Sequence, residues 1–77
     1  MKEEEIKEIL LENNEEFQKV HREHQECEKA LAALQAKSFL SEEERVQEKF
    51  LKKKKLRLKD EMYRMILEFE RQGKGNE

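Results

Sequence analysis

The stretch KSFLSEEE at Lys37–Glu44 separates two helical halves of the sequence and decides its fold. Ser41 is followed three residues later by Glu44, a spacing that forms a capping box at the start of a helix. The two glutamates between them put acidic side chains in the first helical turn, where they interact favourably with the helix dipole. The pattern therefore predicts that a helix begins directly after Ser41.

A second long helix precedes this stretch, and the loop that joins the two is short. Helices joined by a short loop pack as antiparallel neighbours, so with the turn centred near Phe39 a residue i should face roughly residue 78 − i. This register places Val20 opposite Leu58 and Cys27 opposite Leu51. Phe39 and Leu40 are expected to cover the closed end of the hairpin.

Apolar residues recur at steps of three and four in both halves, which is the heptad a/d pattern of helices that pack along one line. We call this line the hairpin seam, and each half contributes one polar member to it. The seam residues are Phe17, Val20, His24, Cys27, Leu31 and Leu34 in the first half and Leu51, Lys55, Leu58, Met62, Met65 and Phe69 in the second. The predicted fold class is all-α, an antiparallel two-helix hairpin resembling a coiled coil, which would form a four-helix bundle as a dimer.

The sequence predicts a single domain over residues 1–77. Asn13 and Asn14 are candidate N-caps for the first long helix, and Gly73 lies where the second should stop. The predicted segments are a short N-terminal helix or extension at 1–12, a first helix at 13–36, a turn at 37–41, a second helix at 42–72 and a disordered tail at 73–77.

The composition excludes most other architectures. The chain has 77 residues, of which 47% are charged and 35% are hydrophobic, and it contains no proline. Both glycines lie among the last five residues, so tight turns are scarce and a β-sandwich or barrel is excluded. A chain this short has too small a core to wall off an active site. We therefore expect a non-enzymatic helical protein without a cofactor.

The sequence also predicts a soluble cytoplasmic protein. Residues 1–5 are acidic, unlike the basic start of a secretory signal peptide. No apolar run approaches the ~20 residues that span a bilayer. The single cysteine, Cys27, cannot form an intramolecular disulfide, so nothing indicates a disulfide-built secreted domain.

The net charge of −2 hides an asymmetry between the two halves. Residues 1–44 carry 6 basic and 13 acidic side chains, whereas residues 45–77 carry 11 basic and 6 acidic side chains. Mutual pairing explains this pattern, because four consecutive lysines point all round a helix instead of forming one face. The alternative is a polyanion, either nucleic acid or an acidic lipid surface. Its candidate contacts are Lys52, Lys53, Lys54, Arg57 and Lys59.

The polar seam residues His24 and Lys55 are predicted to form one layer that fixes the alignment of the helices and has no catalytic role. Lys55 can run its methylenes along the seam and bring its ammonium group toward Glu23. In the same register, Glu26 is expected to face Lys52.

Three potential metal ligands share one helix in the pattern His21-x-x-His24-x-x-Cys27. Successive members are rotated by about 60° around the helix, so the outer two diverge by about 120° and one ion cannot easily take all three. We expect no metal here, with Cys27 buried, His24 in the seam and His21 exposed.

Several apolar residues of the second half lie off the seam, among them Val46 and Ile66. A second apolar stripe on a two-helix unit indicates a partner. The candidate interface consists of Phe50, Leu56, Tyr63 and Leu67. We therefore expect a protein-interaction or self-association module that forms a dimer or binds another helical protein. A small nucleic-acid-associated protein that uses the basic second helix is the alternative.

Three stretches of the sequence carry a resemblance: LKKKKLRLKDEM at Leu51–Met62, Asn-Glu-Glu-Phe ending at Phe17, and the Ser-Glu-Glu-Glu turn. Together they resemble the YdcH-like family of short bacterial proteins, a domain of unknown function. The resemblance covers about residues 13–70 and leaves 1–12 outside. It implies a cytoplasmic antiparallel helical hairpin with no established activity. Some family members carry a label that suggests GTP binding, but the phosphate-binding GxxxxGK[ST] loop is absent from this sequence.

Overall fold

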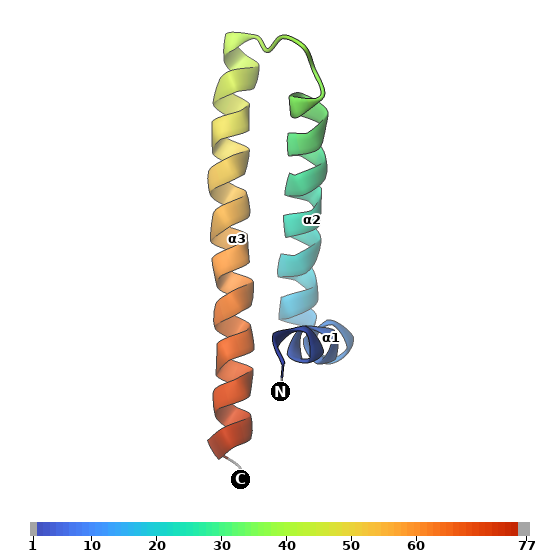
Figure 1. The fold of residues 1–77 in the computed structure, drawn as a ribbon, viewed down its shortest axis with the longest axis vertical. Coiled ribbons are helices and arrows are strands. Elements are labelled where there is room, and N and C mark those ends of the chain that lie inside the picture. The colour runs from blue at the N-terminus through green and yellow to red at the C-terminus, as the bar shows by residue number, and fades with distance from the viewer. Residues whose placement is uncertain (1, 76–77) are drawn as a thin grey trace.

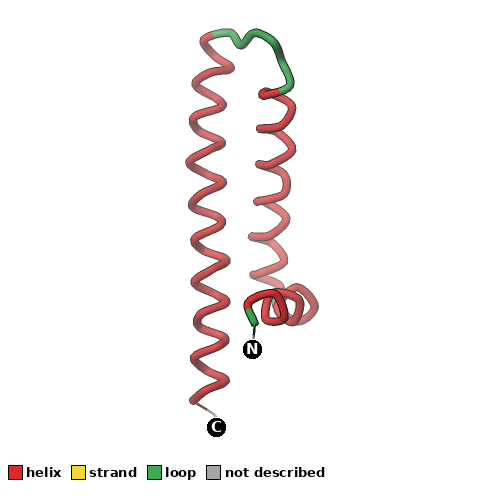
Figure 2. The backbone as a smooth tube through the Cα atoms, viewed as in Figure 1, coloured by secondary structure: helices red, strands yellow, loops and turns green. Residues whose placement is uncertain are grey.

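The computed structural model describes the backbone of residues 2–75 and the side chains of residues 2–73. It is all-helical, as predicted, and has no strand within that range (Figure 2). The three helices are α1 (Glu3–Asn13), α2 (Glu15–Gln35) and α3 (Glu42–Gly75). The described part of the molecule is a rod with extents of 54 × 19 × 18 Å.

Helices α2 and α3 lie side by side and run in opposite directions, joined by a loop at residues 36–41 (Figure 1). Their lengths differ, because α3 has 34 residues and α2 has 21. The rise of about 1.5 Å per residue makes α3 about 20 Å longer than α2. Helix α1 lies crosswise at the N-terminal end of α2 and contacts both other helices (Figure 1).

The capping box predicted at the start of α3 is formed. The backbone N–H of Glu44 donates to the Ser41 hydroxyl oxygen at 3.2 Å, and the Ser41 N–H donates to the Glu44 carboxylate at 3.0 Å. The Lys37 ammonium group also binds this carboxylate and so ties the loop to the helix. The hydrogen bond from Lys37, followed by those from Ser41, lowers the pKa of Glu44 to about 2. The stabilisation that ionised Glu44 gives to the folded state is therefore fully present above its ordinary pKa of 4.5 and is lost as the pH falls toward 2.

A single extended residue, Asn14, divides α1 from α2. Its side-chain oxygen accepts a hydrogen bond from the Phe17 N–H at 2.9 Å, which makes it the N-cap of α2. Its own N–H donates to the carbonyl of Leu10 at 2.9 Å, which closes the last turn of α1. The Gln18 side chain adds a bond to the Leu11 carbonyl at 2.6 Å. Because the backbone leaves the helical region at Asn14 alone, α1 departs sharply from the axis of α2.

The core lies between α2 and α3 and continues under α1. Val20, Cys27 and Leu58 belong to one buried cluster with Leu51 packed against it, so the residues of both expected cross-helix pairs pack together. Of the predicted seam, Phe17, Val20, Cys27, Leu31, Leu34, Leu58 and Met62 are buried, and His24, Leu51, Lys55, Met65 and Phe69 are half-buried. The structure adds Ile6, Leu10 and Ile66 to the core.

Three details differ from the expectations. Ile66 was placed off the seam, yet it is buried, because α1 packs across this part of the molecule. Of the two residues expected at the closed end, Leu40 is half-buried, whereas Phe39 does not cover it, since the loop carries Phe39 into solvent with 78% of its surface exposed. Helix α3 continues past Gln72 to Gly75, because Gly73 keeps a helical backbone and adopts no positive φ that would end the helix. Residues 76 and 77 of the expected tail lie outside the described part.

Replacing Ser41 with alanine should lower the free energy of unfolding by about 1 kcal/mol, because the N–H of Glu44 loses its acceptor at the start of α3. Urea unfolding followed by circular dichroism, at one fixed protein concentration, measures this loss. The exposed loop residue Ser38 serves as the control, and Ser38→Ala should change stability by less than about 0.5 kcal/mol. Equal effects of the two substitutions would show that the capping box is not a stabilising element.

Candidate functional site

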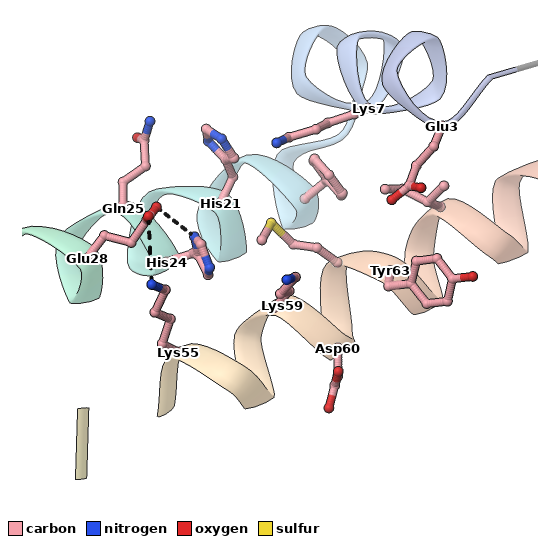
Figure 3. A pocket seen from close by; sticks show the side chains of 13 residues that line it. Glu3, Lys7, His21, His24, Gln25, Glu28, Lys55, Lys59, Asp60 and Tyr63 are labelled. Carbon is pink, nitrogen blue, oxygen red and sulfur yellow. Dashed lines mark ion pairs between the residues drawn. The ribbon is translucent and has the colours of Figure 1, made fainter. Parts of the chain in front are cut away.

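A groove of about 580 Å³ lies where the three helices meet (Figure 3). We call it the three-helix groove. Its apolar lining comes from Phe17, Met62, Tyr63 and Ile66, and its polar lining comes from Glu3 and Lys7 of α1, His21, His24, Gln25 and Glu28 of α2, and Lys55, Lys59 and Asp60 of α3. Every helix thus contributes charged groups to one recess.

Glu28 is the centre of an ion-pair cluster in this groove. One of its carboxylate oxygens lies 3.2 Å from Nδ1 of His24, and the other lies 3.9 Å from Nζ of Lys55 (Figure 3). The side chain of Glu28 is 51% exposed, so water screens both contacts. The cluster joins α2 to α3 at the predicted polar layer.

The sequence indicates Glu23 as the carboxylate partner of Lys55. The structure instead pairs Lys55 with Glu28. Glu28 follows His24 by four residues and therefore shares its face of α2, whereas Glu23 points about 100° away. The expected pair between Glu26 and Lys52 is also wrong. Glu26 is rotated about 200° from His24 and faces away from α3.

Lys52 instead approaches Glu48 of its own helix, at 4.0 Å. This pair is a weak, exposed i,i+4 contact. The i,i+4 relation between His24 and Glu28 was the signal in the sequence that could have identified the correct partner of Lys55.

His24 lies in the predicted polar layer with only 15% of its side chain exposed. Its Nδ1 faces Glu28, but its Nε2 is fully buried and has no hydrogen-bond partner among the described residues. A buried nitrogen without a partner lowers stability, because it has lost its hydration without compensation. The unpartnered Nε2 therefore costs stability at this position.

His21 was expected to be exposed, but the structure leaves it half-buried in the groove. Burial lowers its pKa from the ordinary 6.5, and the positive charge of Lys7 and the neighbouring His24 lower it further, against the opposing effect of Glu28. His21 is therefore mainly neutral at pH 7. Because the folded state binds this proton less readily, the contribution of His21 to stability is present above pH 6.5 and is lost as the pH falls below it.

The metal-ligand pattern does not assemble into a site. Cys27 is a buried free thiol of the core, whereas His21 and His24 line the groove. Within the described residues, no group of three His, Cys, Asp or Glu side chains is arranged to hold a metal ion.

The basic residues proposed as polyanion contacts do not form one surface. Lys55 and Lys59 line the three-helix groove, and Lys52 joins them in a second recess next to it. Lys53 and Arg57 are exposed but line neither recess. Lys54, which was among the predicted contacts, is half-buried.

The four residues of the candidate interface are all exposed on α3. The exposed fractions are 62% for Phe50, 60% for Leu56, 50% for Tyr63 and 42% for Leu67. We call these four residues the outer stripe. None of the described helices is long and apolar enough to cross a membrane.

Comparison with known families relates the paired helices to other proteins. The family model "Protein of unknown function (DUF465)" matches residues 17–66, which is 50 of the 77 residues. The chain belongs to this family. It is the YdcH-like family that the sequence resembles, although the match is narrower than the expected residues 13–70. Neither the curated proteins nor the solved structures gave a match.

The match to the YdcH-like family begins at Phe17 and therefore includes most of α2 and the greater part of α3. Helix α1 lies outside it. Glu3 and Lys7, two of the groove residues that the sequence did not single out, thus come from a segment outside the family match.

The double substitution His24→Leu with Lys55→Leu should keep the free energy of unfolding or raise it by about 1 kcal/mol, because it removes a buried unpaired nitrogen. The same change should loosen the choice of register or oligomeric state. Urea unfolding and sedimentation measure the two effects. Glu28→Gln is the control and should cost less than about 0.5 kcal/mol, since its ion pairs are exposed. Unfolding of the double variant would contradict a structural role for this layer.

Replacing Lys7 with glutamine should raise the pKa of His21, because it removes a positive charge that disfavours the imidazolium form. An NMR titration of the His21 ring protons measures this change. Lys19→Gln removes a charge from the same helix as His21 and should leave the titration unaltered. A wild-type pKa at or above 6.5 would contradict the buried position of His21.

Proposed function

We propose that this protein is a non-enzymatic helix-binding module that associates with a second copy of itself through the outer stripe of α3. The observation that carries the proposal is the exposure of Phe50, Leu56, Tyr63 and Leu67, four large apolar side chains of one helix. Removing such a surface from water is the main favourable contribution to association.

Three of the four residues of the stripe share one side of α3, whereas Phe50 lies about 120° around the helix from Leu56. Leu56, Tyr63 and Leu67 are separated by seven and four residues, and Asp60 completes a series with steps of four, three and four. These positions lie on a different side of α3 from the buried Leu58 and hence remain available after α2 has packed. A second pair of helices laid on this side would make a four-helix arrangement.

Charge supports the pairing of two copies. Helices α1 and α2 together carry 10 acidic and 4 basic side chains, a net charge of −6, whereas α3 carries 8 acidic and 11 basic side chains, a net charge of +3. A two-fold arrangement can place the acidic helices of each copy beside the basic helix of the other.

A non-enzymatic role agrees with the chemistry of the three-helix groove. The carboxylate of Glu28 is engaged by His24 and Lys55 and is exposed to water, which does not favour general acid–base chemistry. A cytoplasmic, bacterial setting is part of the proposal. It is supported by the resemblance and by Cys27, a buried thiol that needs no oxidising compartment.

Nucleic-acid binding is the second candidate function, and one observation favours it. The ammonium group of Lys55 pairs with a carboxylate of α2. Among the described residues, the ammonium groups of Lys52, Lys53 and Lys59 form no such pair with α2. The first half of the chain therefore neutralises the basic run less than the sequence suggested. Titrations with RNA and duplex DNA at two salt concentrations test this alternative.

The double substitution Leu56→Glu with Tyr63→Glu should abolish self-association, because it places charges at the centre of the outer stripe. Sedimentation equilibrium over a range of protein concentrations should give a dimer for the wild type and a monomer for this variant. Phe39→Glu is the control, since Phe39 is equally apolar and more exposed but lies in the loop. A wild-type protein that stays monomeric at high concentration would refute the proposed association.

A further inference from the structure

A second recess of about 590 Å³ adjoins the three-helix groove along the side of the α2–α3 pair. The two recesses share Glu28, Lys55 and Lys59, so they adjoin each other along the α2–α3 pair, and the ion pair between Glu28 and Lys55 borders both. On α2 this elongated depression runs from Phe17 to Gln35, a length of about 27 Å, or five helical turns. We call it the side channel.

The side channel has an apolar floor, whereas most of the residues along its walls are polar or charged. Leu31, Met62 and Ile66 are buried beneath it. Leu56 and Tyr63 of α3 form an exposed wall, and the small side chain of Ala32 forms part of the α2 wall and permits close approach of another helix. An elongated channel with an apolar floor and charged rims fits an amphipathic helix.

The α3 rim of the side channel is basic. Lys52, Lys55 and Lys59 follow one another at steps of three and four, so one ammonium group occurs in each turn. The lining of the second recess holds these three lysines and one carboxylate, that of Glu28, which gives it a net charge of +2. In the three-helix groove, Glu3, Glu28 and Asp60 balance Lys7, Lys55 and Lys59. Lys52 also approaches Glu48 of its own helix at 4.0 Å. Lys55 is paired with Glu28, whereas Lys59 has no carboxylate partner among the described residues. The rim is complementary to negative charge.

The molecule itself provides a precedent for the kind of ligand that this surface suits. Helix α1 carries five glutamates in eleven residues, and it buries Ile6 and Leu10 against the α2–α3 pair. An acidic amphipathic helix therefore already docks on this pair, at the end of the side channel.

We propose that the side channel binds an acidic amphipathic helix of another protein. The ligand helix lies along α3 with its apolar stripe on Leu31 and Leu56, and its carboxylates, about two turns apart, contact Lys52 and Lys59. This inference rests on the proposed function in treating the protein as a helix-binding module. It assigns a different surface and a different partner from the outer stripe, although Leu56 and Tyr63 border both.

The test uses the full chain and a synthetic peptide. The probe is a blocked helical peptide about 18 residues long, with leucine at the a and d positions and glutamate at the flanking positions. A matched peptide carries lysine in place of every glutamate. In NMR titrations, the acidic peptide should shift the backbone amide signals of Leu31, Ala32 and Leu56, and the basic peptide should not.

Charge reversal on the rim separates a site from general attraction. Lys52→Glu with Lys59→Glu should weaken binding of the acidic peptide by at least about tenfold. Lys53→Glu with Arg57→Glu makes the same change in net charge outside the channel and should weaken binding by no more than about threefold. Circular dichroism establishes whether both variants remain helical. Because the control variant carries the same number of charge reversals on the same helix, a general loss of stability should weaken binding equally in both.

Three outcomes would overturn the inference: equal binding of the acidic and basic peptides, equal losses in the two charge-reversal variants, or tighter binding of duplex RNA or DNA at the same amides. Sedimentation equilibrium on the same variants keeps the two proposals apart. The proposed dimer fails if the wild type is monomeric, and the side channel fails if the acidic peptide does not bind, whichever oligomeric state is found.

Discussion

The burial of Phe17 at the junction of the three helices is the contact on which the rest of the structure depends. Its side chain is fully buried, its N–H is held by the Asn14 cap, and it belongs to the cluster that includes Ile6 of α1 and Met62 of α3. Because α3 is longer than α2, the part of α3 beyond the start of α2 needs another cover. The turn at Asn14 brings α1 into that position, and the three-helix groove forms where α1 meets the pair.

The local signals in the sequence were sufficient for the start of α3, and they narrowed the start of α2 to two neighbouring caps, of which Asn14 is the one formed. The Ser41–Glu44 capping box involves atoms only three residues apart, so its hydrogen bonds follow from the sequence alone. The heptad spacing likewise identified Val20, Cys27 and Leu58 as buried residues, because each turns to the same face of its helix.

The contacts that involve α1 could not be obtained in this way. Nothing in its spacing of apolar residues fixes the direction in which it leaves Asn14, and that direction decides whether Ile66 is buried or exposed. The partner of Lys55 was missed for a related reason. A register of facing residues treats each helix as a line, whereas the rotation around α2 decides that Glu28 points toward α3.

The buried thiol of Cys27 gives the chain an internal reporter of its own opening. It is the single cysteine of the sequence, it lies in the core between α2 and α3, and only 3% of its surface is exposed. A thiol-alkylating reagent can reach it only when the two helices separate, so the rate of alkylation measures the frequency of that separation. The equilibrium between the closed pair and an open form can thus be followed without adding any label to the native sequence.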